Sequence, residues 1–189
     1  MGTRGLIGFH YLGVTKAQYN HFDSYPDALG QQAIQDLQEH DLTIDQLRAL
    51  FIGIVLVAND RERPTLEQQQ RYRKFADTNV STSSLDDWYC LLRNTQDGLA
   101  AWLSGDCQHM QDGADFIDSS LFCEYAYIVD LDEGRFEAYQ GFQRQPHQQG
   151  RYAREDAVDG YYPCALVASW PLDRLPTTAE LKAAYEEEG

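Results

Sequence analysis

The sequence has few basic residues, few cysteines and no long apolar segment. Lysine and arginine number 15 against 30 aspartates and glutamates, which gives a formal net charge of −15. A chain of this charge repels phosphate backbones, so we expect no direct binding of nucleic acid. The longest apolar run, residues 50–58, is too short to cross a membrane. No basic-then-apolar leader follows Met1, so we expect a cytoplasmic protein.

Motifs for nucleotide binding and serine hydrolysis are also missing. The sequence contains no G-x-x-x-x-G-K-S/T, no G-x-G-x-x-G and no G-x-S-x-G, so no phosphate-binding loop or nucleophile turn is predicted. The cysteines are irregularly spaced, and three of them lie in apolar runs: Cys90, Cys107, Cys123 and Cys164. This pattern favours buried, reduced thiols over disulfides or zinc ligands. We therefore expect no metal and no cofactor.

What the sequence does have is alternation of the kind found in β-strands. Residues 3–22 alternate on both sides of Gly13, and residues 122–142 alternate on both sides of a turn that ends at Gly134. Both patterns predict β-hairpins. A third apolar run, residues 161–170, predicts a further strand in the centre of the sheet, and residues 143–160 before it are typical of an exposed loop.

The middle of the chain shows helical periodicity instead. Helices are expected over residues 27–40, 43–59, 65–77, 85–93, 98–103 and 178–188. Thr43 and Gln46 fit a capping box at the start of the second helix. Its β-branched second half leaves open a partly extended structure. With 43% hydrophobic residues and no biased linker, we expect one α+β domain over residues 1–189, with a mainly antiparallel sheet.

Five short motifs are distinctive. They are TRG-x-x-GF at residues 3–9, YNHFDSYP at 19–26, DDWYCLLR at 86–93, SLFCEYAY at 120–127 and GFQ at 141–143. Together they resemble a bacterial and fungal family to which no activity is assigned. The resemblance therefore implies no catalytic residue.

The second motif holds the densest set of chemically able side chains. His21 and Asp23 are two residues apart, so on a strand they would share a face and could form an imidazole–carboxylate pair. Tyr25 follows them, and His10 would face His21 in one register of the hairpin. The alternative is that His21 and Asp23 hydrogen-bond to the backbone where the strand turns into a helix. A small hydrolase or transferase that uses His21, Asp23 and Tyr25 is one functional hypothesis.

Acidic residues are concentrated between residues 75 and 134. This stretch contains twelve acidic residues and one basic residue, Arg93. Five of the acidic residues form a candidate binding face: Asp86, Asp87, Asp112, Asp115 and Asp118. A field of one sign steers association with a surface of the other sign. The first functional hypothesis is therefore a non-enzymatic protein that binds a basic partner surface, such as a nucleic-acid mimic that inhibits a nucleic-acid-binding protein. The alternative is that the acidity only confers solubility.

Overall fold

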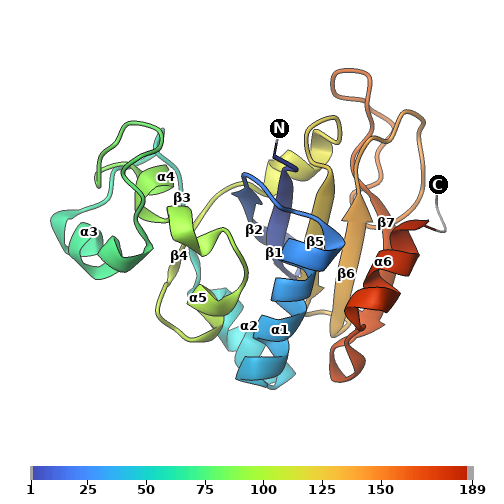
Figure 1. Cartoon of the computed structure of the whole chain (residues 1–189), viewed down its shortest axis with the longest axis horizontal. Coiled ribbons are helices and arrows are strands. Elements are labelled where there is room, and N and C mark those ends of the chain that lie inside the picture. Colours follow the sequence, from blue (N-terminus) through green and yellow to red (C-terminus); the bar gives the residue numbers. More distant parts are fainter. Residues whose placement is uncertain (1, 187–189) are drawn as a thin grey trace.

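The fold is built around a five-stranded sheet (Figure 1). A computed structural model describes residues 2–186 of the chain. The spatial order of the sheet is β2-β1-β5-β6-β7. The strands are β1 (Gly5–Tyr11), β2 (Val14–Asn20), β5 (Tyr125–Asp130), β6 (Arg135–Gln140) and β7 (Ala165–Pro171). Only the β1–β5 neighbours run parallel. The α+β class and both predicted hairpins are confirmed.

The first hairpin closes through a two-residue turn. Leu12 and Gly13 have φ values of 51° and 76°, which suit the right-handed twist of the two strands. The turn sets Tyr11 opposite Val14 and His10 opposite Thr15. This register decides which polar side chains meet at the end of the sheet.

The two faces of the sheet carry separate apolar clusters. Ile7 and Phe9 belong to the larger cluster, with residues of α1 (Gln31–His40), α2 (Ile44–Gly53) and α6 (Thr178–Glu186). Leu6 belongs to the smaller cluster on the other face, with Ile117 and Tyr152. The main helices therefore cover one face, and a 3-10 turn with the loop after β6 covers the other (Figure 1).

A smaller lobe beside the sheet contains the short elements of the middle segment (Figure 1). These are β3 (Val55–Val57), α3 (Leu66–Tyr72), α4 (Trp88–Leu91), α5 (Ala100–Leu103) and β4 (His109–Gln111). Irregular helical turns complete the chain at Pro26–Gly30, Arg73–Phe75, Arg93–Thr95, Ala114–Asp118 and Leu172–Arg174. The capping box of Thr43 and Gln46 is present, and α3 starts with a second one.

Two strand assignments refine or correct the sequence-based prediction. The helix predicted over residues 43–59 ends at Gly53, and Val55–Val57 takes the extended structure that its β-branched residues left open, because it pairs in parallel with β4. The Lys16 ammonium donates to the carbonyls of Phe51 and Ile54 at 2.9 and 2.6 Å, and so satisfies groups freed at this helix end. The last strand is at the edge of the sheet, not at its centre, since among residues 2–186 β7 pairs with β6 alone.

The structure agrees with the expectations of buried, reduced cysteines and of no membrane-spanning segment. All four cysteines are buried and unpaired, and Cys107, Cys123 and Cys164 belong to the apolar clusters. None of the helices within residues 2–186 has the length and apolar character required to cross a membrane. Residues 187–189, the predicted end of the last helix, lie outside the described residues.

Candidate functional site

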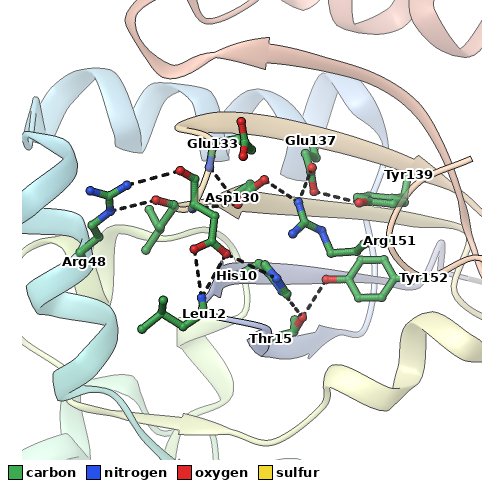
Figure 2. A network of polar contacts seen from close by, with 12 residues as sticks. His10, Leu12, Thr15, Arg48, Asp130, Glu133, Glu137, Tyr139, Arg151 and Tyr152 are labelled. Carbon is green, nitrogen blue, oxygen red and sulfur yellow. Dashed lines mark hydrogen bonds and ion pairs between the residues drawn. The ribbon is translucent and has the colours of Figure 1, made fainter.

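A polar network lies at one end of the sheet and joins four strands to one loop (Figure 2). His10 is on β1, Asp130 is its register partner on β5, and Glu137 is on β6. Because side chains alternate along strands, these three point to the face with the smaller apolar cluster. Arg151 and Tyr152 reach the same place from the loop after β6.

Arg151 holds the two buried carboxylates of this network. Its terminal nitrogen is 2.6 Å from Asp130 Oδ2 and also donates to Glu137 Oε1. The exposed fraction is 2% for Asp130 and 6% for Glu137. Burial raises the pKa of Glu137, although the Arg151 guanidinium and the hydroxyl of Tyr139, 2.8 Å from Glu137 Oε2, stabilise its charged form. The loop is thus fixed to the sheet by charge-assisted hydrogen bonds.

Thr15 lies between an imidazole and a phenol. Its Oγ1 is 2.9 Å from His10 Nδ1 and 2.9 Å from the hydroxyl oxygen of Tyr152. On the other side of the ring, His10 Nε2 is 3.8 Å from Asp132 Oδ2. Asp132 is itself held by the amide of Leu12, which donates to Oδ2 at 3.0 Å. A hydroxyl, an imidazole and a carboxylate therefore follow one another in space (Figure 2).

The protonation states of these groups follow from their surroundings. Burial and the charge of Arg151 lower the pKa of His10 below 6.5, against the opposite effects of Asp130 and Asp132. His10 is therefore neutral at pH 7. Burial raises the pKa of Tyr152 to about 12, so its phenol remains protonated. When Tyr152 donates to Thr15, the Thr15 hydroxyl is left to donate to His10 Nδ1, as a nucleophile donates to its base.

A cleft of about 450 Å³ opens beside the Thr15–His10 pair. Its size is that of a pocket for a small molecule. Polar side chains dominate its lining: His10, Thr15, Asp115, Asp118, Arg151, Tyr152 and Arg154. Arg154 forms an ion pair with Asp118 at 2.9 Å, and its side chain is more than half exposed. Within residues 2–186, no three potential metal ligands converge, here or elsewhere.

The predicted catalytic residues of the YNHFDSYP motif do not converge. The strand ends at Asn20, so the alternation that would place His21 and Asp23 on one face has already stopped. His21 Nδ1 is 2.8 Å from the Tyr19 hydroxyl, and no hydrogen bond joins it to Asp23 among the described residues. Asp23 lines a separate hollow of about 310 Å³.

Among the described residues, neither His10 nor Tyr25 makes a hydrogen bond or a ring contact with His21. The hairpin register pairs Gly5 with Asn20 and His10 with Thr15, so the two histidines lie toward opposite ends of the hairpin. Five residues of strand correspond to roughly 17 Å, which excludes the register in which they face each other. The ring of Tyr25 packs instead near Tyr125, with centroids 5.9 Å apart.

Asp87 cannot belong to an exposed acidic face, which corrects the expectation from sequence. It is 1% exposed and is the N-cap of α4, where it accepts from the Tyr89 amide at 2.8 Å. Burial by itself would raise the pKa of Asp87, but hydrogen bonds from Ser81, Thr82, Asn59 and that amide hold it well below the usual range. Asp87 therefore organises the loop before α4.

The other four carboxylates of the predicted face have different partners. Asp112 pairs with Arg61 at 2.8 Å, and Asp118 pairs with Arg154. Asp86 and Asp115 are exposed. Because exposed charges are the ones that steer a partner, only these two are immediately available for the predicted role.

Sequence reasoning missed most of the residues around the cleft. The pairing of His10 with Thr15 could have been predicted, since a two-residue turn at Leu12–Gly13 implies it. Nothing local marks Arg151 and Tyr152, which lie in a segment expected to be an exposed loop. Only the buried acids on β5 and β6 explain why that loop folds back.

Comparison of the chain with protein-family models, with curated proteins and with solved structures finds no match in any of the three. The fold and the site define an α+β protein with a polar cleft at one end of its sheet.

Proposed function

We propose that the chain is a small hydrolase or acyltransferase in which Thr15 is the nucleophile and His10 the base. The observation that carries this proposal is the 2.9 Å contact between Thr15 Oγ1 and His10 Nδ1 at the wall of an open cleft. A hydroxyl within hydrogen-bond reach of a base that is itself oriented by a third group is the arrangement that activates a weak nucleophile. The sequence analysis also suggested a hydrolase or transferase, but with His21 in the site. The present proposal places the base at His10.

The proposed reaction has two halves. Thr15 Oγ bonds to the carbonyl carbon of a bound ester as its proton passes to His10 Nδ1. His10 then gives this proton to the leaving alkoxide as the carbon–oxygen bond breaks. In the second half His10 takes a proton from water as the water oxygen bonds to the acyl carbon. His10 then gives this proton to Thr15 Oγ as the bond between the acyl carbon and Oγ breaks, and the carboxylic acid leaves. Asp132 stabilises the imidazolium that forms between these steps, from 3.8 Å away.

Two features of the cleft support this assignment. The lowered pKa of His10 keeps the ring neutral, so that it can accept a proton at pH 7. Tyr152 orients the Thr15 hydroxyl from the side opposite to His10. Arg154 lines the same cleft with an accessible guanidinium, which suits an anionic group on the substrate or in the transition state.

The test is hydrolysis of p-nitrophenyl acetate by the purified chain. Thr15→Val keeps the shape of the side chain and removes the hydroxyl, and His10→Gln removes the base. Each should lower kcat/KM by about 10²–10⁴-fold, which is the usual value of base catalysis. Thr78→Val is the matched control, because Thr78 is exposed and outside the cleft. Mass spectrometry of the trapped acyl-enzyme should find the acetyl group on the peptide with Thr15.

Turnover that survives both Thr15→Val and His10→Gln would reject this site. Loss of turnover on His21→Gln, with His10→Gln active, would return the chemistry to the YNHFDSYP motif.

The acidic interaction protein is the second candidate. What supports it is the net charge of −15 together with the exposure of Asp86 and Asp115. A basic partner, such as a nucleic-acid-binding protein, would compete with Arg61 and Arg154 for Asp112 and Asp118. We rank this function below the enzyme, since its five expected contact residues are reduced to two that are free of such competition.

A further inference from the structure

Arg93 is a buried cation with no carboxylate partner among residues 2–186. The residue is 6% exposed, and it is the single base in the acidic stretch of residues 75–134. One terminal nitrogen donates to Gln96 Oε1. The Nε atom is buried and has no acceptor. A guanidinium has five N–H donors and a permanent charge. This arrangement therefore leaves most of its hydrogen-bonding capacity without a protein acceptor.

The surroundings hold the Arg93 guanidinium in place. Its central carbon lies 5.1 Å from the centroid of the Phe22 ring and 5.7 Å from that of Tyr89. The 3-10 turn that starts at Arg93 is tied to β2, because Thr95 and Gln18 exchange two hydrogen bonds. Such a fixed position lowers the entropy that a ligand would lose on binding.

Further positive and donating groups lie beside Arg93. The His21 imidazole is 2.8 Å from the Tyr19 hydroxyl and packs edge-on against Phe22. Burial, then Arg93 and then Arg4 lower the pKa of His21, so both guanidiniums act on this ring. The guanidinium carbon of Arg4 is itself 4.8 Å from the centroid of Phe122.

One acid, Asp97, lies close enough to Arg93 to feel its charge. Arg93 lowers the pKa of Asp97, although burial has the larger and opposite effect. No ion pair within 4 Å joins Asp97 to Arg93 among the described residues. Asp97 is exposed and lines the hollow that also contains Asp23.

These side chains come from four of the five sequence motifs. Arg4 belongs to the first, Tyr19 and His21 to the second, Arg93 to the third, and Phe122 to the fourth. The cleft at Thr15 uses none of them. Phe22 links Arg93 to the Tyr19–His21 pair, and Arg4 acts on the same imidazole through its charge. The proposed catalytic reaction leaves this group of residues unexplained.

We propose that Arg93, Arg4, His21 and Tyr19 form a binding site for a phosphate-type oxyanion. A guanidinium removed from water without a counter-charge is strongly disfavoured, and a bound anion would supply that charge. Donors from three separate segments suit an anion with at least three oxygens, whereas one guanidinium fork is enough for a carboxylate. The site lies four residues of β2 away from Thr15, so it is independent of the proposed catalytic function.

Titration with inorganic phosphate in a buffer of low chloride concentration tests this site. The ring resonances of His21 in the NMR spectrum are the readout, because an anion beside the imidazole changes them directly. We expect a saturable shift in the wild-type chain. Arg93→Gln should weaken binding by at least tenfold, and Arg4→Gln several-fold. Arg174→Gln, which removes an exposed arginine at the opposite edge of the sheet, should leave binding unchanged.

A His21 resonance that does not move with phosphate, or that moves equally in Arg93→Gln and Arg174→Gln, would overturn the proposal. Circular dichroism shows whether Arg93→Gln folds, and if it does not, Arg4→Gln gives the decision. A second titration with glycerol phosphate identifies the source of the anion. Tighter binding than inorganic phosphate would assign the site to a phosphorylated molecule, and weaker binding would assign it to the free ion.

Discussion

The guanidinium of Arg151 lies 2.6 Å from the carboxylate of Asp130, across 21 residues of chain. The same nitrogen donates to Glu137, and both acids are almost fully buried. Arg151 is therefore the cation that makes two negative charges tolerable inside this end of the sheet. The position of Tyr152, and with it the orientation of Thr15, depends on this pairing.

Replacement of Arg151 by methionine should destabilise the fold strongly. The variant would leave Asp130 and Glu137 buried without their partner, a situation that typically costs about 3–5 kcal/mol. Urea unfolding followed by circular dichroism measures the loss. Arg144→Met is the control in the same loop, and as a surface change it should cost less than about 0.5 kcal/mol.

The charge explanation has its own check. Adding Glu137→Gln to Arg151→Met removes one of the stranded charges, so the double variant should be more stable than Arg151→Met alone. If the double variant is less stable by the sum of both single effects, Arg151 acts through packing and not through charge.

The activity of the cleft should depend on pH through His10. The base must be neutral, so kcat/KM should fall on the acidic side as His10 becomes protonated, below its ordinary value of 6.5. Asp132 raises the pKa of His10, and Asp132→Asn should therefore shift this acidic limb to lower pH. A rate profile of p-nitrophenyl acetate hydrolysis between about pH 4 and 8 tests this, and an unshifted limb would separate Asp132 from the base.

Asp87 should contribute stability that acid removes. Its pKa in the folded chain is well below the ordinary 3.8, so the contribution is present above that value and is lost as pH falls toward the folded pKa. Asp87→Asn should cost about 2–4 kcal/mol at neutral pH, because several donors lose a charged acceptor. The difference from wild type should shrink as unfolding is measured at lower pH. Asp86→Asn, one residue away and exposed, should show neither effect.

The interaction hypothesis predicts a binding event controlled by Asp86 and Asp115. Reversing both to lysine should slow association with a basic partner and leave the fold intact, since both are exposed. Binding by wild type should weaken steeply with salt, because exposed charges are screened over about 8 Å at physiological ionic strength. Affinity capture from lysate at two salt concentrations, followed by surface plasmon resonance, measures both. A double reversal that binds like wild type would exclude this face.

The thiols should be unreactive in the folded chain. All four are buried and unpaired, and burial raises the pKa of Cys107 to about 11, which leaves almost no thiolate at neutral pH. Ellman's reagent should therefore react with all four cysteines only after denaturation. Fewer reactive thiols in denaturant without reductant would reveal a disulfide.

The sequence by itself determined the elements whose signals are local. Alternation on both sides of Gly13 and Gly134 is enough to specify two hairpins, since each strand pairs with its neighbour in the chain. The capping box of Thr43 fixes the start of α2 within one turn of helix. Irregular spacing and apolar surroundings were likewise sufficient to place the cysteines in the interior.

Tertiary structure decided the elements and contacts that join distant segments. The local sequence of Val55–Val57 is compatible with helix or strand. It forms a strand because β4, more than fifty residues later, supplies its hydrogen-bonding partner. Asp87 looks like one acid among many, and only the packing of its donors around it turns it into a buried cap. Arg151 lies in a polar segment with no periodicity, yet two buried carboxylates draw it into the protein. Charge pairing and burial act through space, and the order of residues in the chain does not record which distant side chains will meet.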